Sequence, residues 1–218
     1  MKTRLLIIIS FFLVSFHLLA DDVFVQDFRT RASLTLKYKP IKELTLNWTE
    51  EARFKNNSSK FDRLYSGLGI TYNAHKNFSM GATYEFHVIQ KGVDYFQLRH
   101  RAKLFLQPSI NFNGFTLSLR EMGQMTYSTS PAWELRSRLR LNYNFKDKHL
   151  KPYIYAEMYN PLDKAEYEKS WVSQVDYKVG LEWKIDAVNG LDFYYLFEHV
   201  VPSKAGYHIV GVAYNLGL

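Results

Sequence analysis

The sequence predicts an all-β protein, a single antiparallel up-and-down β-barrel that spans an outer membrane. Three observations indicate this fold. The chain starts with a segment typical of a secretory signal, most of the rest alternates apolar and polar residues, and the last segment alternates up to the final residue. Mean hydropathy is only -0.27. Such an average is compatible with a membrane barrel, because only alternate residues of each strand face lipid.

The N-terminus has a basic start, with Lys2 and Arg4, followed by an almost wholly apolar stretch over residues 5–19. An apolar core of about fifteen residues is typical of a signal peptide and short for a spanning helix. We expect cleavage after Ala20, which gives a signal peptide over residues 1–20 and a barrel domain over residues 21–218. An uncleaved anchor is the alternative. Export of this kind predicts an outer-membrane location in a Gram-negative cell.

Period-two alternation, which is typical of strands with two unlike faces, covers nearly all of the chain after residue 26. The patterned segments are residues 27–39, 43–55, 61–73, 78–88, 96–106, 115–126, 133–145, 150–160, 175–185, 191–199 and 207–218. These are eleven segments, but single-chain bacterial barrels normally have an even strand number. We therefore expect about twelve strands, with ten as the next alternative. The count is least defined at residues 22–30 and at 107–114, where Pro108 interrupts the pattern.

The connections alternate in length, which is typical of outer-membrane barrels with tight turns at one end and longer loops at the other. The expected tight turns are residues 39–42, 73–77, 113–114, 146–149 and 189–190. The expected longer loops are residues 56–60, 89–94, 127–132, 160–170 and 200–206. The pairs Asn113-Gly114 and Asn189-Gly190 predict two-residue hairpins, because both residue types accept a positive φ.

Alternation alone does not decide which row of side chains faces the interior, because a soluble barrel places its apolar row inside. Besides the signal segment, aromatic residues near both ends of the apolar rows favour a membrane barrel, since they match interfacial girdles. Those near tight turns are Tyr38, Tyr72, Phe78, Tyr143, Phe145 and Trp183, and those near longer loops are Trp48, Phe54, Phe86, Phe96 and Trp133. We therefore expect contact with outer-membrane lipid and a polar lumen.

The polar row then places a ladder of charges in the lumen. Its members are Glu85, Arg99, Arg101, Lys103, Arg120, Glu134, Arg136, Arg138, Arg140 and Glu157. One hypothesis is a narrow passive channel for ions or small anionic solutes, because Arg and Lys rings favour anions. The alternative is a non-conducting structural or interaction barrel, in which salt bridges fill the lumen. Barrel size leaves both open, because about eight strands give a filled interior and about sixteen a channel.

Other activities have weaker signals. The chain has no Cys, no paired His motif and no Gly-rich phosphate loop, so we expect no metal, no cofactor and no catalytic residues. A lipid-modifying enzyme, which would use Ser66 and His100 on the apolar rows, is the least favoured hypothesis. The formal charge is +7, but Lys and Arg are spread over most segments rather than clustered, so nucleic acid is not an expected partner. Nothing in the sequence sets an oligomeric state.

Several segments carry a resemblance to a known family. They are residues 44–54 with Glu51 and Arg53, residues 95–103 with Arg99-His100-Arg101, residues 135–141 with three arginines, and Lys151-Pro152-Tyr153 followed by Ala156-Glu157. In these features most of the mature chain resembles an uncharacterised family of outer-membrane barrels, known only as a domain of unknown function. The resemblance implies the barrel and its location, and no activity.

The C-terminal strand also resembles the signal that the barrel-assembly machinery recognises in outer-membrane proteins. That resemblance implies the machinery as a partner. The usual last residue of the signal is Phe, and this chain has Leu218 instead.

Overall fold

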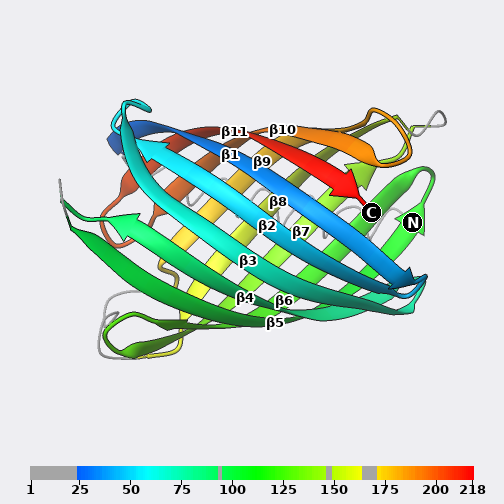
Figure 1. Cartoon of the computed structure of the whole chain (residues 1–218), viewed down its shortest axis with the longest axis horizontal. Coiled ribbons are helices and arrows are strands. Elements are labelled where there is room, and N and C mark those ends of the chain that lie inside the picture. The colour runs from blue at the N-terminus through cyan, green and yellow to red at the C-terminus, as the bar shows by residue number, and fades with distance from the viewer. Residues whose placement is uncertain (1–23, 93–94, 146–148, 164–170) are drawn as a thin grey trace.

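A computed structural model describes residues 24–92, 95–145, 149–163 and 171–218, and in these ranges the chain is a closed barrel of eleven strands (Figure 1). The strands are β1 (Phe24–Ile41), β2 (Leu44–Lys55), β3 (Lys60–His75), β4 (Phe78–Gln90), β5 (Phe96–Phe112), β6 (Phe115–Tyr127), β7 (Pro131–Tyr143), β8 (Leu150–Pro161), β9 (Gln174–Lys184), β10 (Asn189–Val200) and β11 (Ala205–Gly217). Each strand pairs with its neighbours in chain order, and β1 pairs with β11 to close the barrel. The all-β prediction is confirmed. The expected signal peptide lies outside the described residues.

The expected even strand number is wrong, because each of the eleven patterned segments forms one strand. An up-and-down barrel with an odd number of strands has its first and last strands running in the same direction. Accordingly β1 and β11 form a parallel ladder from Phe24↔Ala205 to Lys37↔Gly217, whereas the other ten ladders are antiparallel. Phe24, at the start of blue β1, and Gly217, at the arrowhead of red β11, therefore lie at opposite ends of the barrel (Figure 1).

The two regions where the strand count was least defined, residues 22–30 and 107–114, contain no additional strand in the part that the structure describes. Residues 24–30 belong to β1, which runs on without a break to Ile41. Pro108 lies inside β5 and pairs with Phe78 of β4. The ladder between β5 and β6 skips residues 107 and 108, then resumes at Ser109 in the same register. The missing N–H of this proline therefore interrupts pairing locally without ending the strand.

Three connections at one end of the barrel, residues 42–43, 76–77 and 113–114, are shorter than the connections 56–59, 128–130 and 201–204 at the other end, but the connection 185–188 does not follow this predicted asymmetry. Asn113 and Gly114 have φ values of 48° and 82°, so they form the predicted two-residue hairpin. Gly190 instead belongs to β10, and the turn before it is held by Asp186. The Asp186 carboxylate accepts hydrogen bonds from the backbone N–H groups of Val188 and Asn189 and from the Asn189 side chain. These hydrogen bonds lower the pKa of Asp186 below its usual range.

We call the end with the connections β1–β2, β3–β4, β5–β6, β7–β8 and β9–β10 the turn end, and the opposite end the loop end. The expected turn at 146–149 and the expected loops at 89–94 and 160–170 lie partly outside the described residues. In the described part of the chain, no helix is long and apolar enough to cross a bilayer.

The two faces of the barrel wall differ in chemistry. Large apolar side chains project outward on every strand and are exposed, for example Leu68 at 63% and Leu104 at 68%. The inward rows carry charged side chains together with Tyr65, Tyr153, Tyr155, Tyr159 and Tyr194. The inward row also contains glycines that make room for these rings: Tyr194 lies across Gly211, and Tyr153 lies across Gly180. A ring packed over a backbone glycine pins two neighbouring strands together.

Candidate functional site

The lumen contains a cavity of about 780 Å³, and all ten residues of the predicted charge ladder line it. They come from β4, β5, β6, β7 and β8, where alternation turns one row of each strand toward the lumen. Twelve basic and nine acidic side chains line this cavity. The described lumen therefore has an excess of positive charge.

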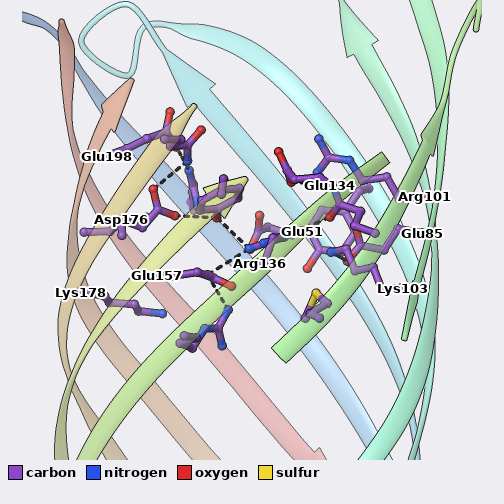
Figure 2. Close-up of a pocket in the computed structure, with 18 of the residues that line it drawn as sticks. Glu51, Glu85, Arg101, Lys103, Glu134, Arg136, Glu157, Asp176, Lys178 and Glu198 are labelled. Atoms are coloured by element: carbon purple, nitrogen blue, oxygen red, sulfur yellow. Dashed lines mark hydrogen bonds and ion pairs between the residues drawn. The ribbon is translucent and has the colours of Figure 1, made fainter. Parts of the chain in front are cut away.

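The centre of one wall is an ion-pair network around Glu157, which is only 1% exposed. Its Oε2 atom lies 3.0 Å from a terminal nitrogen of Arg136 and 2.8 Å from one of Arg138. Arg136 also donates a hydrogen bond of 2.7 Å to the Tyr159 hydroxyl, which donates to Asp176 at 2.8 Å. Figure 2 shows this chain of contacts, which joins β7, β8 and β9.

A second cluster, around Glu85, lies to the right of the first in Figure 2. Glu85 of β4 lies 2.5 Å from the Lys103 ammonium of β5 and 3.0 Å from Nε2 of His87. Glu134 accepts a hydrogen bond from Gln124 at 3.2 Å. Both clusters contain ion pairs between neighbouring strands. Part of the ladder therefore holds the barrel wall together, besides giving the lumen its polar lining.

Each arginine of β7 also stacks on a tyrosine of β8. The distances from guanidinium to ring centre are 4.2 Å for Arg136 and Tyr159, 4.6 Å for Arg138 and Tyr155, and 3.9 Å for Arg140 and Tyr153. Cation–π contacts of this kind hold a guanidinium flat against the wall. These tyrosines are not among the residues predicted for the lumen. The spacing of two residues could have identified them, because it places Tyr153, Tyr155 and Tyr159 on the same face of residues 150–160 as Glu157.

Three members of the ladder, Arg99, Arg101 and Arg120, form no ion pair with a described carboxylate. Arg99 and Arg101 have neither an ion pair nor a side-chain hydrogen bond among the described residues, and their Nε atoms are buried without a partner. Arg120 donates to the Gln107 amide oxygen at 2.7 Å and lies over the Phe105 ring at 4.6 Å. These guanidinium groups line the cavity, so they can bind an anion that enters it.

The pair weighed for a lipid-modifying enzyme is not brought together. Ser66 and His100 both face outward, but Phe86 of β4 lies between them in the same row. They are two strands apart, so about 10 Å separates their backbones. Ser66 accepts a hydrogen bond from Nε1 of Trp48, and His100 shares one with the Tyr84 hydroxyl. Within the described ranges, no cluster of three or more His, Asp or Glu residues could hold a metal ion.

The comparisons identify the family. Residues 29–205 match the model of a family described as "Protein of unknown function (DUF2490)", so the chain belongs to that family. This confirms the resemblance to an uncharacterised family. No curated protein matches.

Two solved structures are similar to the chain at low identity. The first, solved under the description "Unveiling the Mechanism Behind the in-meso Crystallization of Membrane Proteins", has 11% identity and a TM-score of 0.41 over 79% of this chain and 77% of that one. The second is the translocator domain of autotransporter NalP from Neisseria meningitidis. It has 13% identity and a TM-score of 0.40 over 78% of this chain and 72% of that one.

Proposed function

We propose that this protein is an outer-membrane barrel whose lumen is a narrow passage for ions and small anionic solutes. The observation that carries the proposal is the pair Arg99 and Arg101, two lumen guanidiniums that form no ion pair with a described carboxylate and whose buried Nε atoms have no hydrogen-bond partner. An interior built only to be filled would pair its buried charges, because an uncompensated buried charge is costly. Unpaired guanidiniums beside a cavity of about 780 Å³ fit a lumen that attracts mobile anions.

Membrane insertion is supported by the outer wall. Exposed leucines, isoleucines, valines and aromatic residues occupy the outward rows around the barrel. In water this surface would far exceed the apolar patch of an ordinary monomer. In a bilayer it is the lipid-facing band, and closure of the sheet leaves no unpaired strand edge in the hydrocarbon. Insertion through the barrel-assembly machinery, with β11 as the recognised strand, is part of the proposal.

The width of the passage determines which solutes can cross it. Side chains fill barrels of about eight strands, and about sixteen strands leave an open channel. Eleven strands fall between these limits. The ion pairs around Glu157 and Glu85 occupy part of the lumen, whereas inward residues nearer the turn end include the short polar side chains of Ser109 and Ser118. The passage therefore suits small hydrated ions, with transport rather than catalysis as the role.

The test is the reversal potential of the refolded chain in a planar bilayer under a salt gradient. We expect anion preference, and we expect Arg99→Gln with Arg101→Gln to reduce it. The matched control is Lys42→Gln with Lys76→Gln, which removes the same charge from exposed turn positions and should leave the potential unchanged. A conducting barrel without anion preference, or an equal effect of the two double variants, would contradict the role of the arginines.

A non-conducting barrel is the second candidate, and the Glu157 network favours it. That network ties β7, β8 and β9 together through direct side-chain contacts inside the lumen. If such contacts close the lumen completely, inserted protein will carry no current, and a structural or interaction role follows.

A further inference from the structure

The outer wall carries a polar pair that the passage does not use. His100 of β5 projects outward, and its Nδ1 atom lies 2.6 Å from the Tyr84 hydroxyl of β4. The ring also packs against Phe86, with 5.2 Å between ring centres. When the phenol donates to Nδ1, the neutral imidazole has its proton on Nε2. That N–H has no partner among the described residues, so it is available to an acceptor outside the wall.

A groove in the wall adjoins this pair. It has a volume of about 620 Å³, and Tyr84 is one of its lining residues. Its floor is formed by the small outward residues Ala82, Ala102 and Gly123, and a Cβ atom added at Gly123 would meet nothing within 4 Å. Its sides include Leu104 and Trp133. The groove is therefore apolar and open, and the His100 imidazole lies beside Tyr84 at its edge.

The order of residues along β5 gives the groove a direction. His100 is nearer the loop end, and Ala102 and Leu104 follow toward the middle of the strand. A molecule that lay in the groove with a polar group on His100 would point its apolar part toward the centre of the wall. A membrane phospholipid has this polarity, with a phosphate at the surface and acyl chains below it.

We propose that this groove binds one phospholipid, with a phosphate oxygen accepting from Nε2–H of His100 and an acyl chain lying over Ala82, Ala102 and Gly123. The inference rests on the membrane insertion proposed above. An anionic headgroup is favoured over a zwitterionic one, because it brings no cation of its own to the phosphate. The exposed residue Lys91, in the connection between β4 and β5, adds positive charge at the same end.

The same arrangement occurs a second time, which supports a role for it at the membrane surface. His208 of β11 lies 2.5 Å from the Tyr195 hydroxyl of β10 and packs against Phe197, with 5.2 Å between ring centres. Six strand steps separate β4 from β10, so the two pairs lie on opposite sides of an eleven-stranded barrel. The second pair provides a matched control, because it has the same chemistry away from the groove.

Trp133 lines the groove, so its fluorescence can report on the occupant. The full chain with Trp48→Phe, Trp171→Phe and Trp183→Phe would be reconstituted in phosphatidylcholine vesicles that contain phosphatidylglycerol with brominated acyl chains. Bromine quenches a tryptophan that it touches. A reference chain would retain Trp183 of β9 instead, with Trp48→Phe, Trp133→Phe and Trp171→Phe. We expect brominated phosphatidylglycerol to associate at least about tenfold more strongly at Trp133 than at Trp183, as for one hydrogen bond to a charged group.

Two variants should abolish this preference. His100→Ala removes the donor, and Ala102→Leu fills the groove floor. The controls are His208→Ala, at the second pair, and Ala32→Leu, which adds the same volume to an exposed outward alanine of β1. Neither control should change the quenching of Trp133. Equal association at Trp133 and Trp183, or equal effects of variants and controls, would overturn the lipid site.

Brominated phosphatidylcholine separates failure of the lipid site from failure of the proposed function. If it quenches both tryptophans while phosphatidylglycerol shows no preference, the barrel is inserted and only the lipid site is wrong. If it quenches neither, both membrane insertion and the lipid site are contradicted.

Discussion

The Lys103 ammonium lies 2.5 Å from Oε1 of Glu85, and this ion pair crosses from β5 to β4 inside the lumen. Glu85 also shares a hydrogen bond with His87. Its register partner on β5 is Arg101, which forms no ion pair with a described residue. Replacement of this carboxylate would therefore leave Lys103 without its ion-pair partner and would remove the negative charge opposite Arg101 in the β4–β5 ladder. The same ion pair therefore occupies space in the lumen and reduces its net positive charge.

The first prediction concerns this pair. Glu85→Gln keeps the size of the side chain and removes its charge, so the lumen gains net positive charge beside Lys103 and Arg101. We expect anion preference to increase, measured as a larger reversal potential under a fixed salt gradient. Glu43→Gln, at an exposed turn position, is the control for total charge. A reversal potential that is unchanged or moves toward cations would contradict a selectivity role for this cluster.

A second prediction concerns stability. Glu157→Gln would leave the guanidiniums of Arg136 and Arg138 without their shared carboxylate in a buried position. We expect the free energy of unfolding to fall by about 3 kcal/mol, as when one partner of a buried ion pair is removed. Denaturant titration of the folded barrel in lipid vesicles measures this loss.

The control for that variant is Glu182→Gln. Glu182 pairs with Arg140 at 2.5 Å, but its side chain is 39% exposed, so we expect a loss below about 1 kcal/mol. Equal losses for the two variants would show that burial of the Glu157 network does not govern its contribution.

The third prediction tests how rings pack over glycines. Gly211→Val places a branched side chain where the Tyr194 ring lies, so the ring has to leave its position. We expect the free energy of unfolding to fall by about 1–3 kcal/mol, as in other overpacked positions. Gly123→Val is the control, because a Cβ there meets open space. A stable Gly211→Val barrel would indicate that Tyr194 does not hold β10 against β11.

The fourth prediction tests the parallel closure. Ala32 of β1 and Val212 of β11 are register partners on the outer wall, and the chain has no native cysteine. We expect Ala32→Cys with Val212→Cys to form a disulfide on oxidation, seen as altered migration on a gel without reductant. Ala32→Cys with Leu216→Cys is the control, because Leu216 lies four residues, or about 13 Å, further along β11. A cross-link in the control pair, and none in the test pair, would contradict this register.

Much of the fold could be predicted from the sequence, because alternation directly reports which side of a strand faces polar surroundings. The row Arg136, Arg138 and Arg140 was placed in the lumen for this reason, and all three line the cavity. The strand number was wrong for a different reason. The pattern itself contained eleven segments, and a general rule about even numbers replaced that count with twelve. Parallel closure of β1 and β11 leaves no trace in local alternation.

The pairing of charges could not be predicted, because register and side-chain reach are set by contacts between distant strands. Glu157 was expected in the ladder, but nothing local shows that it serves two arginines of β7. The predicted hairpin at Asn189-Gly190 was wrong for a related reason. Asn189-Gly190 has the composition of a two-residue hairpin, yet Asp186 accepts three hydrogen bonds and closes a turn that precedes it.

We claim that an inserted eleven-stranded barrel conducts anions, and single-channel recording in a planar bilayer measures this conduction. Insertion would be established separately, by migration on a gel that changes when the folded barrel is boiled. We expect small, steady openings whose reversal potential under a salt gradient shows anion preference. An inserted barrel that carries no current would contradict the claim and would mean that the paired charges around Glu157 and Glu85 close the lumen.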